Sequence, residues 1–142
     1  MDLTKNPLYS ETVSLTVPFH DTDAMGVVWH GNYFRYFELA REALLRKFAY
    51  SYQQMKDSGY SWPVVDARAK YIAAVYVEQQ LFIKAQIMEY ENRLRINYEI
   101  TDAQTNKRLT TGYTIQVAVS LEKQEMSYIC PQILWDKLGV KP

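Results

Sequence analysis

The segment that holds Asp21, Asp23, Gly26, His30 and Gly31 has the residue types needed for chemistry on a carbonyl group, and a long amphipathic segment follows it at once. The first N–H groups of a helix have no internal partner and lie at the positive end of its dipole. Such groups can stabilise an oxyanion, and a carboxylate facing them can attack the carbonyl or activate a water molecule. The spacing therefore predicts a carbonyl-directed site where the helix begins.

Ordinary structural roles also account for these residues. An aspartate in a polar loop before a helix commonly forms a turn or a cap, and a lone histidine commonly packs or makes a hydrogen bond. Gly26 and Gly31 are expected where the backbone needs positive φ or a close approach. Asp21 is expected to shape the loop by binding backbone N–H groups.

Two periodic segments would position this site. Residues 12–19 alternate polar and apolar, which predicts a strand with Val13, Val17 and Phe19 on one face. From about Asn32 to Met55, apolar residues recur at intervals of three, four and seven without Gly or Pro. This pattern predicts one helix of about six turns.

Short strand patterns fill the rest of the chain after a helix stop at 57–60, and they lie at residues 63–65, 81–87, 93–100 and 115–121. Residues 102–107 have turn composition, which predicts an antiparallel hairpin. One strand, one helix and about four further strands predict an α+β fold, a curved antiparallel sheet wrapped around one long central helix. The free edges of such a sheet favour association between copies.

Composition indicates one domain over residues 1–142, because 48% hydrophobic residues in a chain of this length suffice for one core. Sixteen basic and sixteen acidic residues give no net charge, so we expect neither nucleic acid nor a membrane as a partner. A single Cys130 and two histidines favour neither a disulfide nor a metal site. Met1–Pro7 lacks the apolar centre of a secretory signal, so we expect a cytoplasmic protein.

A dense motif supports a more specific hypothesis. It reads Asp-x-Asp-x-x-Gly-Val-Val, then an aromatic residue, a His or Tyr, and an Asn-Tyr pair that opens the helix. The matching residues are Asp21, Asp23, Gly26, Val27, Val28, Trp29, His30, Asn32 and Tyr33. On this motif the chain resembles the hotdog-fold acyl-CoA thioesterases of the 4-hydroxybenzoyl-CoA thioesterase class, over nearly its whole length.

The resemblance implies a site for hydrolysis of acyl-CoA to a free acid and CoA, without a cofactor. It implies that Asp23 is the catalytic carboxylate, as a nucleophile or as a general base. It also implies that backbone N–H groups of His30 and Gly31 polarise the thioester carbonyl. The active site would be shared within a homodimer, which could pair further into a homotetramer.

Further residues are candidates for substrate contact. Around the acyl group we expect Gly26, Val28, Trp29 and Tyr33. Coenzyme A carries phosphates, so Arg93 and Arg95 on the polar face of one predicted strand, together with Lys84, are candidates for its nucleotide end. Exposed cations on strands also serve solubility and cross-strand pairing.

Three alternatives stay open. A second branch of hotdog thioesterases places its acid on the helix, where this chain has Glu38, although a helical glutamate also suits an ion pair with Arg35 or Arg41. A binding module for acyl-CoA or acyl-carrier protein would keep the pocket without catalysis. A dehydratase would need a His–acid pair, for which only His20 and His30 are available.

Overall fold

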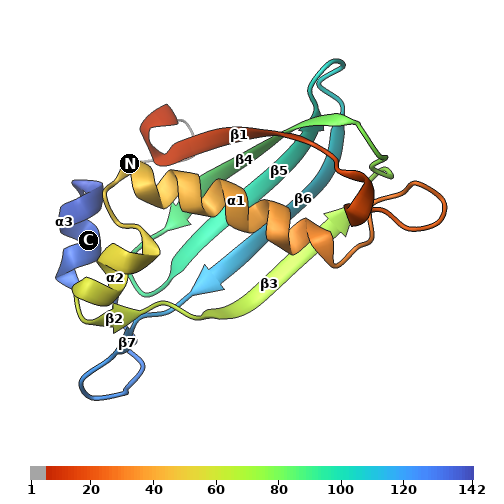
Figure 1. Cartoon of the computed structure of the whole chain (residues 1–142). Helices are drawn as coiled ribbons and strands as arrows, with labels where there is room; N and C mark the ends of the chain where they lie inside the picture. The colour runs from red at the N-terminus through yellow and green to blue at the C-terminus, as the bar shows by residue number, and fades with distance from the viewer. Residues whose placement is uncertain (1–5) are drawn as a thin grey trace.

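The computed structural model describes residues 6–142, which form one five-stranded antiparallel sheet and one long helix (Figure 1). The helices are α1 (Asn32–Lys47), α2 (Tyr52–Asp57) and α3 (Gln132–Leu138). The strands are β1 (Ser10–Thr16), β2 (Tyr60–Ser61), β3 (Val64–Tyr71), β4 (Gln80–Glu89), β5 (Leu94–Asp102), β6 (Arg108–Gln116) and β7 (Val119–Ser120). The strand order is β1-β4-β5-β6-β3, with β2 and β7 paired separately.

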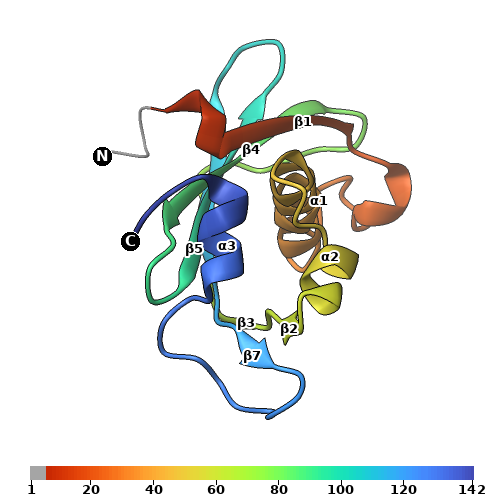
Figure 2. The same ribbon diagram turned by 90° about the vertical axis from the view of Figure 1, so that its left-hand side faces the viewer.

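The sheet curves around α1, as the end-on view shows (Figure 2). Alternation in the strands explains the packing: in β4 and β5, Leu81, Ile83, Ile96 and Ile100 are fully buried and their neighbours face outward. The predicted α+β architecture is confirmed. So is the predicted hairpin, because β5 and β6 pair in antiparallel fashion across residues 103–107.

At Gly112 of β6, a side chain of α1 packs directly against the backbone of the sheet. Phe37 of α1 stacks on Tyr98 of β5 with ring centroids 4.5 Å apart. A Cβ atom on Gly112 would lie 2.6 Å from the Phe37 ring and 2.4 Å from the backbone oxygen of Arg68. Glycine is therefore required here for the helix to reach the sheet.

The first strand is shorter than predicted. It ends at Thr16, and Phe19 lies in a 3-10 turn with 81% of its surface exposed. The expectation that Phe19 faces the core is therefore wrong. Pro18 interrupts the strand because it has no N–H for a ladder hydrogen bond.

The single helix predicted over residues 32–55 is also wrong, because α1 ends at Lys47 and α2 begins at Tyr52. Ala49 adopts φ +55°, its N–H binds Arg46 O, and Tyr50 N–H binds Leu45 O. These two bonds form a Schellman C-cap, which usually carries glycine. Because this position holds alanine and not glycine, the sequence contains no signal for the end of α1.

The last strand pattern is shifted from the prediction. The predicted strand over 115–121 coincides only with the end of β6 and with the short β7. In β6 the inward positions include Thr110, Thr114 and Gln116, which are polar and yet buried. Polar residues on the buried face conceal the alternation of β6, and α3 was not predicted.

Within residues 6–142, no helix is both long and apolar enough to cross a bilayer. The segment on which the expectation about a secretory signal depends lies largely outside the described residues.

Candidate active site

Asp23 lies at the start of a tight loop before α1. Its backbone N–H binds Val27 O at 2.8 Å, and Gly26 N–H binds Asp23 O at 3.0 Å. Gly26 has φ +73°, the left-handed conformation that glycine adopts without strain. The loop is fastened to residues 75–77, since Val28 N–H binds Val75 O and Val77 N–H binds Gly26 O. The position of Asp23 is therefore fixed on both sides.

The Asp23 carboxylate is exposed and only partly engaged. Its Oδ1 accepts N–H bonds from Met25 at 2.8 Å and Val27 at 3.2 Å. No group within residues 6–142 donates a hydrogen bond to Oδ2. One oxygen thus orients the carboxylate, and the other is free to meet a reactant.

Asp21 anchors this loop to α1 and is 3% exposed. Its Oδ2 accepts the hydroxyl of Tyr36 at 2.7 Å, and its Oδ1 forms an ion pair with Arg35. Its backbone oxygen accepts Trp29 N–H at 3.0 Å and Asn32 Nδ2 at 2.9 Å. The expectation that the Asp21 side chain binds backbone N–H groups is wrong, because that side chain binds α1 instead.

The Asp21–Tyr36 contact perturbs the tyrosine. Burial raises the pKa of Tyr36, and the hydrogen bond to Asp21 raises it further, against the lowering effect of Arg35. The phenol therefore stays protonated and continues to donate its hydrogen bond at neutral pH. The first turn of α1 and the Asp23 loop are held as one unit.

Two backbone N–H groups at the start of α1, those of His30 and Gly31, have no hydrogen-bond acceptor in the described part of the chain. The next two N–H groups are paired, because Asn32 N–H binds Trp29 O and Tyr33 N–H binds His30 O. The indole of Trp29 lies directly over Gly31, where a Cβ atom would be 2.1 Å from the ring.

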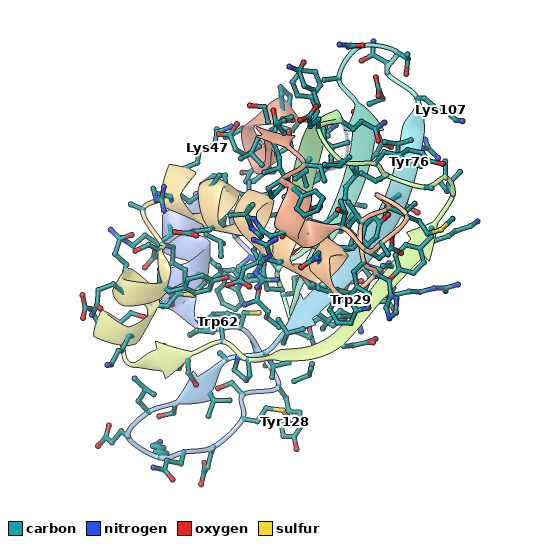
Figure 3. All side chains as sticks on the ribbon, turned by 45° about the vertical axis from the view of Figure 1, so that its right-hand side comes forward. Trp29, Lys47, Trp62, Tyr76, Lys107 and Tyr128 are labelled. Carbon is teal, nitrogen blue, oxygen red and sulfur yellow. The ribbon has the colours of Figure 1, made fainter. Side chains whose placement is uncertain are left out.

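A hollow of about 390 Å³ joins the acid to the helix start. From the loop and α1 it is lined by Asp23, Val27, Val28, Trp29, His30 and Tyr33, and from the end of β3 and beyond by Tyr71, Ile72, Ala73 and Ala74. Trp29 and Tyr76 lie on the side of the molecule where α1 begins, whereas Trp62 lies toward the other end (Figure 3). Most of its lining residues are aliphatic or aromatic, and one of them is an acid.

Tyr33 and Tyr71 form an aromatic wall, with ring centroids 4.8 Å apart. Tyr33 is 3% exposed, and burial followed by the neighbouring Tyr71 raises its pKa, while polar groups of Thr110 and Val75 lower it. The Tyr33 hydroxyl is therefore neutral at physiological pH. It can serve a substrate only as a neutral hydrogen-bonding group or as apolar surface.

The residues predicted for catalysis and for contact with the acyl group lie in or beside this hollow. Asp23, Val28, Trp29, His30 and Tyr33 line the hollow together. Gly26 and Gly31 shape its loop and its helix start but are not among the lining residues.

The cations predicted for the nucleotide lie elsewhere. Arg93 pairs with Glu89 at 2.7 Å, and Arg95 stands over the Tyr113 ring on the outer face of the sheet. Lys84 also faces outward, from β4. None of these side chains is brought to the hollow that holds Asp23.

The rival acid Glu38 is exposed on α1 and does not line the hollow. Its expected ion-pair partners are engaged elsewhere. Arg35 binds Asp21, while Arg41 is buried and donates to the hydroxyls of Tyr52 and Tyr98.

Residues 71–74 line the hollow although the sequence motif did not predict them. They comprise the last residue of the edge strand β3 and the three residues after it, and they reach α1 only through the sheet topology. The apolar run Tyr71-Ile72-Ala73-Ala74 after an alternating basic strand was the one signal available. Within residues 6–142, no cluster of three or more His, Cys, Asp or Glu side chains is arranged to hold a metal ion.

Comparison with known proteins identifies the family. The profile of the thioesterase-like superfamily matches residues 17–134. A Synechocystis protein with a provisional esterase name, sll0410, is 30% identical over 89% of this chain and 76% of its own length. The acyl-CoA thioester hydrolase YbgC of Escherichia coli O6:H1 is 32% identical over 71 residues, about half of each chain (50% and 53%).

Solved structures agree on the fold. A 1,4-dihydroxy-2-naphthoyl-CoA thioesterase from Synechocystis superposes with a TM-score of 0.81 at 23% identity, over 92% of this chain and 96% of that one. The chain therefore belongs to the thioesterase-like superfamily and is a thioester hydrolase of the hotdog fold, as its aspartate–glycine motif predicted.

Proposed function

We propose that the protein hydrolyses acyl-CoA thioesters to a carboxylic acid and CoA, with Asp23 as the catalytic carboxylate. The observation that carries the proposal is the single hollow lined by both Asp23 and His30. A thioester carbonyl placed there would have a carboxylate oxygen on one side and the unpaired N–H groups of His30 and Gly31 on the other. The YbgC relative supports the choice of acyl-CoA as substrate.

The reaction balances in either of two ways. Asp23 attacks the carbonyl carbon, CoA leaves as a thiolate that takes up a proton, and water hydrolyses the mixed anhydride. Alternatively, Asp23 takes a proton from a water molecule, whose oxygen attacks the carbonyl carbon. The C–S bond then breaks, and the departing CoA thiolate takes up the proton from Asp23. In both, the oxyanion is stabilised by backbone N–H groups without a metal ion.

Thiol release from a panel of acyl-CoA substrates tests the proposal. Asp23→Asn should lower kcat by about 100-fold or more, the range typical for loss of a general base. Glu38→Gln is the matched control and should keep near-normal turnover. Near-normal activity of Asp23→Asn would refute the assignment, and binding of acyl-CoA without turnover would favour a binding module. A covalent adduct on Asp23, detected by mass after rapid quenching, would select the nucleophilic route.

We further propose that two copies pair through β3 and complete the site. This strand is at one edge of the sheet, and seven of its eight residues are exposed. Val65 is 56% and Tyr71 is 48% exposed, which is unusual for apolar residues of one strand. Because Tyr71 lines the hollow, a second β3 beside it would bring atoms of the partner to the substrate.

Light scattering and activity, measured together, test the pairing. Val65→Lys should yield monomers with reduced kcat, because a lysine on an edge strand opposes pairing. Thr12→Lys on the opposite edge strand β1 is the control, and should remain a dimer. A fully active monomer in either case would contradict the shared site.

A further inference from the structure

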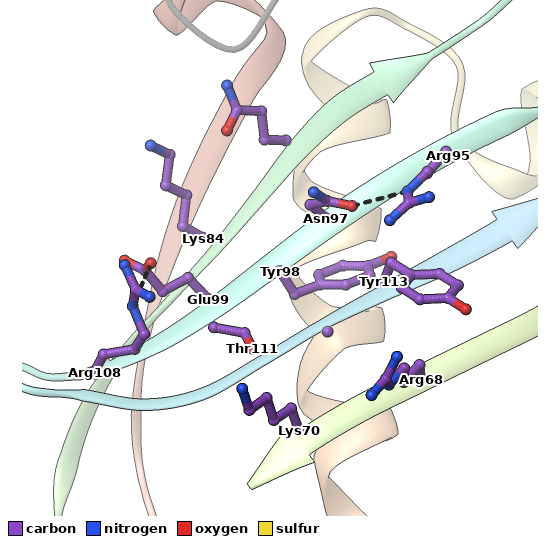
Figure 4. Close-up of a pocket in the computed structure, with 12 residues that line it drawn as sticks. Arg68, Lys70, Lys84, Arg95, Asn97, Tyr98, Glu99, Arg108, Thr111 and Tyr113 are labelled. Carbon is purple, nitrogen blue, oxygen red and sulfur yellow. Dashed lines mark hydrogen bonds and ion pairs between the residues drawn. The ribbon is translucent and has the colours of Figure 1, made fainter. Parts of the chain in front are cut away.

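A second, larger hollow of about 530 Å³ lies on the outer face of the sheet, the face turned away from α1 (Figure 4). Five cationic side chains and one carboxylate line it: Arg68, Lys70, Lys84, Arg95, Arg108 and Glu99. The whole chain has no net charge. Positive charge is therefore concentrated at this hollow.

Most of this charge is uncompensated. Arg108 pairs with Glu99 at 3.2 Å. Within residues 6–142, no carboxylate comes within ion-pair distance of Arg68, Lys70, Lys84 or Arg95. Asp66, on β3, is bound by the Tyr113 hydroxyl at 3.3 Å. Like charges gathered on one sheet face repel one another, and an anion bound among them relieves that repulsion.

Arg95 is held ready for such an anion. Its Nε donates to Asn97 Oδ1 at 3.2 Å, and its guanidinium stands 4.4 Å from the centre of the Tyr113 ring. A guanidinium fixed in this way presents a planar set of donors that matches phosphate oxygens. The side chains of Asn97 and Thr111 add neutral polar groups between the cations.

The cations are spread across the sheet in register. Lys84 of β4 pairs with Glu99, Glu99 with Thr111, and Thr111 with Lys70 of β3. Three strand spacings separate the two lysine positions, about 14 Å. A single phosphate cannot contact both ends of this row, whereas a ligand with separated phosphate groups can.

The outer hollow is distinct from the candidate active site. Lys70 and Tyr71 are consecutive in β3, so their side chains point to opposite faces of the sheet. Lys70 lines the outer hollow and Tyr71 lines the hollow of Asp23. We propose that the outer hollow is a second ligand site, which binds a small soluble molecule carrying two or more phosphate groups.

A nucleotide has this chemistry, and it could be the nucleotide end of a CoA ester or a free nucleotide. The proposal concerns binding and does not depend on the proposed catalytic role of Asp23. Calorimetry with adenosine 3′,5′-bisphosphate, ATP, CoA and inorganic phosphate at 150 mM salt tests it. The bisphosphate should bind more tightly than inorganic phosphate, and higher salt should weaken binding.

The double variant Lys70→Gln/Lys84→Gln should bind the bisphosphate at least tenfold more weakly. Lys107→Gln/Lys123→Gln removes two exposed lysines outside the hollow and should bind normally, and thermal melts establish that both variants fold. If the ligand is the CoA nucleotide, the first variant raises KM for acyl-CoA but not for acyl-pantetheine. If it is a free nucleotide, the bisphosphate binds without changing KM. Undiminished binding by the first variant, or no binding by the parent, would overturn the proposal.

Discussion

Replacement of the buried Asp21 by asparagine should destabilise the fold and reduce turnover together. An amide has one acceptor oxygen, so it can serve Tyr36 or Arg35 but not both. The bond to Tyr36 falls from charge-assisted to neutral strength, a loss of about 1 kcal/mol. The ion pair with Arg35, whose side chain is 49% exposed, adds about 0.5–1 kcal/mol.

The total loss of about 2 kcal/mol corresponds to a fall in Tm of about 6 °C for a domain of this size. Urea unfolding measures the free energy, and thiol release measures kcat at a temperature where the variant is folded. Asp136→Asn is the matched control, because Asp136 is exposed and accepts one bond from Gln132; its stability should change by less than about 0.5 kcal/mol. Parent-like stability and kcat of Asp21→Asn would refute the anchoring role.

Three other substitutions test the fold. Gly112→Ala should lower stability by about 1–3 kcal/mol in denaturant titrations, because its Cβ would overlap the Phe37 ring; an unchanged midpoint would contradict the close contact. Ala49→Gly should raise stability by about 0.5–1 kcal/mol, since φ +55° suits glycine, and a loss of stability would argue against this cap. Hydrogen bonds from Gln79 and from the N–H groups of Thr105 and Gln104 lower the pKa of Asp102 from 3.8 to about 2. Asp102→Asn should therefore be less stable than the parent at pH 7, with a difference that disappears as pH falls from about 4 to 2; a difference independent of pH would exclude this origin.

The sequence predicted the fold where local signals agree with the tertiary structure. The alternation of apolar and polar residues predicted β4 and β5 because the inward residues of both strands are aliphatic or aromatic. It failed in β6, where Thr110, Thr114 and Gln116 face the core. The end of α1 was not predicted because Ala49 occupies the positive-φ position of the C-cap, where glycine is the usual signal in a sequence.

The site was predictable only where its residues are neighbours in the chain. Asp23, Trp29, His30 and Tyr33 belong to one motif, and the structure gathers them around one hollow. The remaining wall comes from the end of β3 and the residues after it, which lie about forty positions away and reach α1 only through the order of strands. The role of Asp21 was also beyond reach, because its partner Tyr36 is fifteen residues away on a helix face.

The contact between the Trp29 indole and Gly31 has an evolutionary consequence. Any side chain at position 31 would occupy the space of the ring, with a Cβ atom only 2.1 Å from it. Descendants of this chain that acquire a larger residue there should also replace the tryptophan, so that the two positions vary as a pair in an alignment. A library that varies positions 29 and 31 together, selected for folded and active protein, would test this coupling. The selected variants should combine a large residue at one of the two positions with a small residue at the other.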